Sequence, residues 1–278
     1  MTSTLPPVHA AFVARILAAV KHHPYVDGLL AGGSFIHGGL DEHSDLDFVL
    51  VIDEVAYPQV MNSRMAFAQS LGTLISAFSG EHVGEPRLLI CLYGPPLLHV
   101  DLKFVTASDL DHRIEMPAVL FARDRERIAA QLGAATIAWP NMSPDWFEAR
   151  AWIWLHYAAT KLLRGELFEA VGMLSFFREQ VLGPMLYRRA GLPQRGVRRI
   201  EMLGLDGDKA LASTAPQLEA ASVRAALLSA LNLYLQLRAD APPQNATDGM
   251  PSMLLSFLGA DLSCSNVISV PEAQDVID

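Results

Sequence analysis

The sequence has few cysteines, no long apolar run and no excess of basic residues, and each shortage excludes a class of protein. Cys91 and Cys264 are the two cysteines among 278 residues, so neither a disulfide framework nor a cysteine-rich metal site is expected. No continuous apolar run reaches the roughly 18–20 residues that a membrane-spanning helix needs. The N-terminus also lacks the basic and then apolar pattern of a signal peptide. These absences predict a cytoplasmic protein that does not cross a membrane.

The charge balance narrows the choice of partners. The formal net charge is −9, which disfavours nucleic acid because the phosphate backbone calls for a basic surface. Neutral or cationic small substrates suit an acidic protein better. Apolar residues make up 51% of the chain, enough to build the core of one large or two medium domains.

Hydrophobic periodicity predicts a chain that changes class near its middle. Before residue 140 it predicts helices at 8–22, 58–78 and 124–132, and strands at 47–52, 87–93, 97–105 and 118–122. After a proline-rich turn at 139–144 it predicts helices at 144–164, 166–182 and 216–238. We therefore predict an α/β (α+β) domain with a mixed sheet at 1–140. An all-α helical-bundle domain that binds substrate is expected at 141–240, and a C-terminal tail at 241–278.

The most informative stretch is 31–53, AGGSFIHGGLDEHSDLDFVLVID. Gly32 and Gly33 offer backbone N–H groups that no side chain shields, and Ser34 adds a hydroxyl. Such groups can hold a polyphosphate. This part of the sequence predicts a phosphate-binding loop that leads into a strand.

Three carboxylates follow that loop. Asp45 and Asp47 are two residues apart at the start of a predicted strand, so both face one side, about 6–7 Å apart along the chain. Asp101 shares one face of the second hairpin strand with His99 and Lys103, while the residues between them face the core. Carboxylate oxygens suit Mg²⁺, which prefers hard ligands together with substrate phosphates. The sequence therefore predicts a magnesium site.

These residues resemble the motif set of the polymerase-β-like nucleotidyltransferase superfamily, and they read GGS (32–34), SDLDFVLV (44–51) and HVDLKFV (99–105). The helical half is similar in layout to the antibiotic nucleotidyltransferases that modify aminoglycosides or lincosamides. The resemblance implies that Asp45 and Asp47 bind two Mg²⁺ ions. It also implies that Asp101 binds one of them and helps to deprotonate an acceptor hydroxyl.

The resemblance further implies where the other groups bind. Gly33 and Ser34 would hold the β- and γ-phosphates of ATP, the co-substrate, and His37 stands where relatives often have arginine. Lys161 would reach the triphosphate from the helical domain, and Glu166 would hold an amine or hydroxyl of the acceptor. The implied enzyme moves a nucleoside monophosphate, AMP from ATP, to a hydroxyl of a small molecule such as an aminoglycoside-like antibiotic, an activity that confers resistance.

Alternatives remain open at this stage. The chain could nucleotidylate a protein partner, or be a non-catalytic nucleotide-binding or antitoxin-like module. Asp101 could pair with Lys103 as an ordinary strand carboxylate. Lys161 could be a solvated lysine, and Glu166 a carboxylate that stabilises a helix start.

Overall fold

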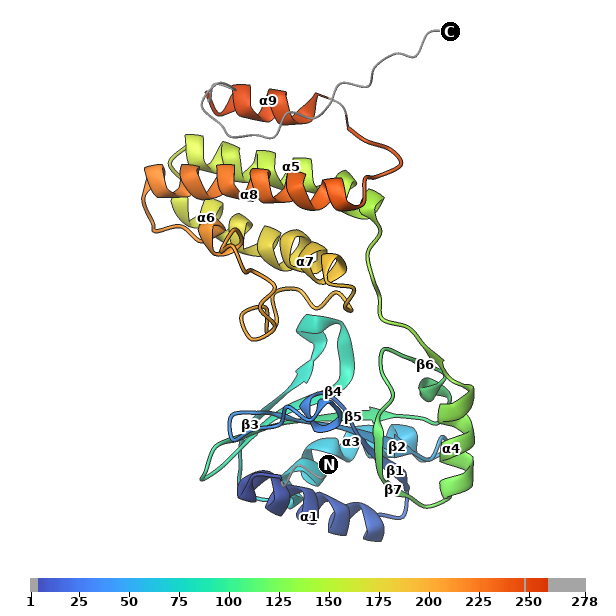
Figure 1. Cartoon of the computed structure of the whole chain (residues 1–278). Coiled ribbons are helices and arrows are strands. Elements are labelled where there is room, and N and C mark those ends of the chain that lie inside the picture. The colour runs from blue at the N-terminus through green and yellow to red at the C-terminus, as the bar shows by residue number, and fades with distance from the viewer. Residues whose placement is uncertain (1–4, 248, 260–278) are drawn as a thin grey trace, which may run out of the picture. The chain divides into compact units, whose positions relative to one another are not determined.

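The computed structural model describes residues 5–247 and 249–259, which belong to two compact units, Met1–Trp139 and Pro140–Asp278 (Figure 1). The first unit is an α/β domain and the second is built from helices. The expected fold class is therefore confirmed.

A six-stranded mixed sheet forms the first unit, in the order β3-β4-β5-β2-β1-β7. Its strands are β1 (Val26–Ala31), β2 (Leu46–Ile52), β3 (Leu74–Gly80), β4 (Glu85–Tyr93), β5 (Leu98–Val105) and β7 (Ala118–Ala122). β2 and β5 run parallel, and the other neighbouring strands run antiparallel. The short strands β6 (His112–Arg113) and β8 (Thr136–Ile137) form a separate parallel pair.

The helices of this unit are α1 (Pro7–His22), α2 (Ser34–His37), α3 (Tyr57–Ser70) and α4 (Arg125–Ala134), with single turns η1 (Glu81–Val83) and η2 (Ser108–Leu110). Alternation along β2 divides its side chains between two faces. Phe48 and Leu50 are buried in one core with Phe12 of α1. Asp47 and Val49, on the opposite face, are only partly buried.

The face that carries Asp47 is covered at its far end. Val51 of β2 and Val105 of β5 pack there with Ile128 and Leu132 of α4, and Figure 1 shows α1 and α4 on different sides of the sheet. The α4 core therefore lies at the end of β2 opposite to Asp47.

The second unit contains α5 (Pro144–Leu163), α6 (Leu167–Phe177), η3 (Arg178–Leu182), α7 (Gly183–Arg189), η4 (Ala212–Thr214), α8 (Ala220–Asp240) and α9 (Met250–Phe257). α5 begins where the sequence predicts it, because Ser143 caps the helix by accepting a hydrogen bond from Trp146 N. One hydrophobic core joins all of its longer helices.

By length and composition, α8 is the one helix among the described residues that could span a membrane. Its buried residues include Leu227, Leu231 and Tyr234, which belong to the core of the second unit. In this structure α8 is therefore a core helix.

The structure differs from the predicted elements in three places. The helix expected at 58–78 ends at Ser70, and β3 follows it. The helix expected to stop at residue 182 continues through a π-type turn into α7. The expected tail from residue 241 is packed in its described part, because Leu254 and Leu255 of α9 enter the core; residues 260–278 lie outside the described residues.

Candidate functional site

The Gly-Gly-Ser loop connects β1 to α2 and lies against the start of β2. The backbone N–H of Gly32 donates to the carbonyl oxygen of Asp47 at 3.0 Å. Gly33 has a positive φ of 56°, and a Cβ placed on it would lie 2.0 Å from Asp47 Oδ2. Glycine is therefore required at residue 33 by its backbone conformation and by the neighbouring carboxylate.

Two of the predicted carboxylates are brought together by strand pairing. Asp47 of β2 and Asp101 of β5 are register partners on neighbouring parallel strands. Both are partly buried, and alternation puts both on the face opposite to α1. Asp45 is the residue directly before Leu46, where β2 begins, so it precedes the strand and does not belong to it.

The electrostatics of Asp101 link it to Asp45. Burial raises the pKa of Asp101, and the negative charge of Asp45 raises it further. His99 acts in the opposite direction, and its Nε2 lies 3.0 Å from Asp101 Oδ1. Asp45 and Asp101 therefore influence each other electrostatically, although more than fifty residues separate them in the sequence.

The expected alternative, a pair between Asp101 and Lys103, does not form. Lys103 Nζ lies 2.7 Å from Glu85 Oε2, and Arg87 also pairs with Glu85 at 2.6 Å. Hydrogen bonds from Arg87 are the largest influence on Glu85 and, with Lys103, lower its pKa to about 2. Lys103 therefore belongs to an ion-pair group on β4 and β5, separate from Asp101.

A tight turn fixes the approach to Asp45. Asp41 Oδ1 accepts hydrogen bonds from His43 N at 3.0 Å and from Ser44 Oγ at 2.9 Å. The carbonyl oxygen of Ser44 is in turn 2.7 Å from Nε2 of the buried His9 on α1. This turn therefore ties the segment before β2 to the first helix.

Sequence reasoning missed Glu115. Its Oε1 accepts a hydrogen bond from Gly33 N at 2.9 Å, and its Oε2 lies 2.8 Å from His37 Nε2. Ala31 of β1 pairs with Ala118 of β7, so the residues after β1 meet those before β7. No local pattern in the sequence gives this contact, because it depends on the register of two distant strands.

The other predicted phosphate-binding residues lie on α2. Ser34 is buried at the start of this helix, and His37, at its end, contacts the Glu115 carboxylate. Their roles in nucleotide binding stay predictions, as does that of Gly33.

The two candidates of the helical unit contact each other. Lys161 Nζ lies 2.5 Å from Glu166 Oε2, and Arg164 Nε lies 3.1 Å from Glu166 Oε1. Lys161 also lies over the ring of Tyr157, 5.2 Å from its centroid. Lys161 and Glu166 are thus an ion pair at the junction of α5 and α6, and their binding roles stay predictions.

The donor set near Asp47 suits Mg²⁺ by its chemistry. In the part of the chain that the structure describes, no three His, Cys, Asp or Glu side chains converge as a ready-made metal cluster. Mg²⁺ does not need such a cluster, because it binds through one or two carboxylates together with water and substrate phosphates. Asp47 and Asp101 on the paired strands would be the carboxylates that hold such an ion, and Asp45 lies close enough to influence Asp101.

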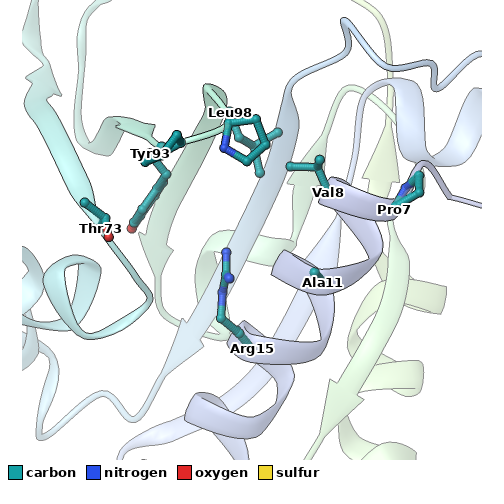
Figure 2. Close-up of a pocket in the computed structure, with 10 residues that line it drawn as sticks. Pro7, Val8, Ala11, Arg15, Thr73, Tyr93 and Leu98 are labelled. Atoms are coloured by element: carbon teal, nitrogen blue, oxygen red, sulfur yellow. The ribbon is translucent and has the colours of Figure 1, made fainter.

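A separate pocket of about 340 Å³ lies between α1 and the turn that joins β4 to β5 (Figure 2). Val8, Ala11 and Arg15 line it from α1, and Tyr93 and Leu98 line it from the strands. Leu98 belongs to the buried face of β5 that packs toward α1. The pocket is therefore on the opposite face of the sheet from Asp47 and Asp101.

The first unit is thus an α/β domain in which a glycine loop lies against Asp47 and Asp47 pairs with Asp101 in a mixed sheet, and an all-helical unit follows it. Among solved structures, the chain is similar to an aminoglycoside 6-adenyltransferase from Bacillus subtilis. The two share 13% sequence identity with a TM-score of 0.38, over 91% of this chain and 98% of that chain.

The chain is also similar to a nucleotidyltransferase-like protein from Exiguobacterium sibiricum, with 12% identity and a TM-score of 0.38, over 82% of this chain and 75% of that chain. No family model matches the sequence, and no curated protein matches it. Both TM-scores are below 0.5, so the function proposed below rests on the residues of this chain.

Proposed function

We propose that the protein is a Mg²⁺-dependent nucleotidyltransferase that moves AMP from ATP to a hydroxyl group of a small molecule. The observation that carries this proposal is the pairing of Asp47 with Asp101 on parallel strands, with Asp45 directly before β2 and the Gly33 loop against Asp47. Carboxylates next to a glycine loop can serve a metal–triphosphate complex, whereas a purely structural aspartate pair has no need of the loop.

Each residue has a role in this reaction. The Gly33 N–H and the Ser34 hydroxyl hold oxygens of the β- and γ-phosphates. The acceptor oxygen forms a bond to the α-phosphorus as the bond to pyrophosphate breaks, and the hydroxyl proton passes to the Asp101 carboxylate. Asp45, Asp47 and Asp101 would hold Mg²⁺, which when bound would neutralise the charge of the phosphates.

The class of acceptor is inferred from the net charge of the protein. A net charge of −9 favours a neutral or cationic hydroxyl compound over an anionic one. An aminoglycoside-like antibiotic has both the hydroxyls and the positive charge. We expect the reaction in the cytoplasm, where ATP is present and where cysteines stay reduced.

The test is pyrophosphate release with ATP, GTP, CTP and UTP in turn, against a panel of aminoglycosides and lincosamides. With the accepted pair, Asp45→Asn and Asp47→Asn should each lower turnover at least about a hundredfold, because each removes a charge that faces the metal and phosphates. Unchanged turnover in both variants would rule out this mechanism.

Asp53→Asn is the matched control. Asp53 follows the other end of β2, and its Oδ1 accepts from Val55 N and Ala56 N, each at 3.0 Å. An asparagine oxygen can accept the same hydrogen bonds, so this variant should keep full turnover. Labelled AMP found on a protein, with no small acceptor in the panel, would point instead to a protein partner.

A further inference from the structure

The Glu115 side chain is held in the way that an anionic ligand is held. One carboxylate oxygen accepts the Gly33 N–H at 2.9 Å, and the other contacts His37 Nε2 at 2.8 Å. These are two groups that a bound triphosphate would use in the proposed function. A Cβ on Gly32 would also lie 3.4 Å from Glu115 Oε1, so the carboxylate lies directly against the glycine pair.

Glu115 lies in a short segment, 114–117, between two strands that are each paired with another strand. On one side, His112 and Arg113 of β6 pair with β8. On the other side, Ala118 of β7 pairs with Ala31 of β1. Between these points the neighbours of Glu115, Ile114 and Met116, are exposed. Glu115 is the member of this segment whose side chain contacts the loop.

The side chains around Glu115 would suit another anion in the same place. His37 lies at one carboxylate oxygen. Burial lowers the pKa of the Arg113 guanidinium, and the nearby charge of Glu115 opposes that shift. Among the described residues, Arg113 Nε is buried without a hydrogen-bond partner. Without the Glu115 charge, this region would be more positive and would attract phosphate more strongly.

The Gly33 N–H cannot donate fully to the Glu115 carboxylate and to a phosphate at the same time. The negative carboxylate would also repel a triphosphate beside it. We propose that Glu115 is a built-in occupant of the phosphate position, which the nucleotide must displace before it can bind. This inference rests on the proposed function, and it adds a residue that sets the affinity of the site for triphosphate. Glu115 is a competitor for the loop and not a catalytic residue.

The experiment measures binding by titration calorimetry with three probes: Mg²⁺·ATP, inorganic tripolyphosphate with Mg²⁺, and AMP. The variants of the full chain are Glu115→Gln, which keeps the shape and removes the charge, and Glu115→Ala. Glu126→Gln is the matched control, because Glu126 is an exposed acid in the first turn of α4 in the same unit. This control measures how far the loss of one negative charge outside the loop changes the affinity for each probe.

Both Glu115 variants should bind Mg²⁺·ATP and tripolyphosphate about ten- to a hundredfold more tightly than the unaltered protein, the range expected for charge-assisted hydrogen bonds that no longer have to be displaced. AMP has no β- or γ-phosphate, so its affinity should stay within about twofold. The Glu126→Gln control should match the unaltered protein with every probe. ATP binding seen in the Glu115 variants alone would support the proposal as well.

Two results would overturn the proposal while the proposed function stands. In one, all proteins bind Mg²⁺·ATP equally. In the other, both Glu115 variants bind it more weakly, so that Glu115 supports the loop. If neither the unaltered protein nor any variant binds Mg²⁺·ATP or tripolyphosphate, both the inference and the proposed function are wrong.

Discussion

Gly33 is subject to two constraints, its backbone conformation and the neighbouring Asp47 carboxylate. Its φ of 56° is in the left-handed region, and a Cβ would clash with the Asp47 carboxylate. Gly38 has a similar φ of 68°, but a Cβ placed on it would meet no other atom within 4 Å. The two glycines also differ in ψ, which is 11° at Gly38, a left-handed helical conformation, and −134° at Gly33, a conformation that is almost confined to glycine. A side chain at residue 33 therefore meets both a costlier backbone conformation and a clash.

We predict that Gly38→Ala lowers the free energy of unfolding by about 1–2 kcal/mol, the cost of a left-handed alanine, and leaves ATP affinity unchanged. Gly33→Ala should cost at least as much and should also weaken Mg²⁺·ATP binding by tenfold or more, because Asp47 or the loop must move. Denaturant unfolding and calorimetry measure the two effects. Equal ATP affinities in the two variants would contradict a role for the loop beside Asp47.

Single residues show how far the sequence could predict the site. The glycine loop and Asp45–Asp47 are near each other in the sequence, so their spacing makes them candidates, and the alternation around Asp101 is also a local pattern. Glu115 could not be predicted, because it reaches Gly33 through the pairing of β1 with β7. The partner of Lys103 was hidden for the same reason, since Glu85 is on a neighbouring strand.

Helices and strands show the same limit at a larger scale. The helix predicted at 58–78 extends past the end of α3 because residues 74–78 are apolar enough for a helix. Only their pairing with β4 makes them a strand. Gly183 and Pro184 predict a helix stop, yet the chain passes through a π-type turn there. Gly183 is needed because its Cβ would lie 2.2 Å from the carbonyl oxygen of Gly196. Local propensity does not include either tertiary contact.

α5 and α8 are joined by a buried carboxylate. Glu148 is 2% exposed and accepts hydrogen bonds from Trp152 Nε1 at 2.9 Å, Tyr234 Oη at 2.6 Å, Arg238 Nε at 2.8 Å and Thr247 N at 2.8 Å. Burial alone would raise the pKa of Glu148, but these donors outweigh it and lower the pKa to about 2. The charged form is therefore part of the folded state.

Glu148→Gln should destabilise the second unit by about 3–5 kcal/mol, because it breaks a buried ion pair and leaves the partly buried Arg238 without its counter-charge. The pH dependence has a definite sign. The pKa is lower in the folded state than its ordinary value of 4.5, so the carboxylate stabilises the fold above that value. This contribution, about 3 kcal/mol, is lost as the pH falls toward about 2.

Thermal melts between pH 7 and pH 2.5 measure both effects. The variant should melt lower at pH 7, and the difference from the unaltered protein should shrink as the pH falls. Glu169→Gln is the control, since Glu169 is an exposed residue on α6 whose hydrogen bond to Tyr157 is at the surface. It should change stability by less than about 1 kcal/mol at any pH. A constant gap between Glu148→Gln and the unaltered protein would contradict the charge argument.

At the scale of the whole molecule, each hydrophobic core closes within one unit. The two cores of the first unit draw on residues between Leu5 and Leu132, and the core of the second draws on residues between Trp146 and Leu258. The sequence indicated this division by its change from mixed to helical periodicity at the proline-rich turn. A chain with separate cores is expected to fold as separate units.

We predict that fragments 1–139 and 140–278 each fold cooperatively when expressed alone, and that calorimetry of the full chain resolves two transitions. Glu148→Gln should lower the melting temperature of the transition that fragment 140–278 shows alone, and Gly33→Ala should lower that of fragment 1–139. Each substitution should leave the other transition within about 1 °C, because it alters a core or loop of one unit only. A single transition that both substitutions shift would mean that the two units unfold as one.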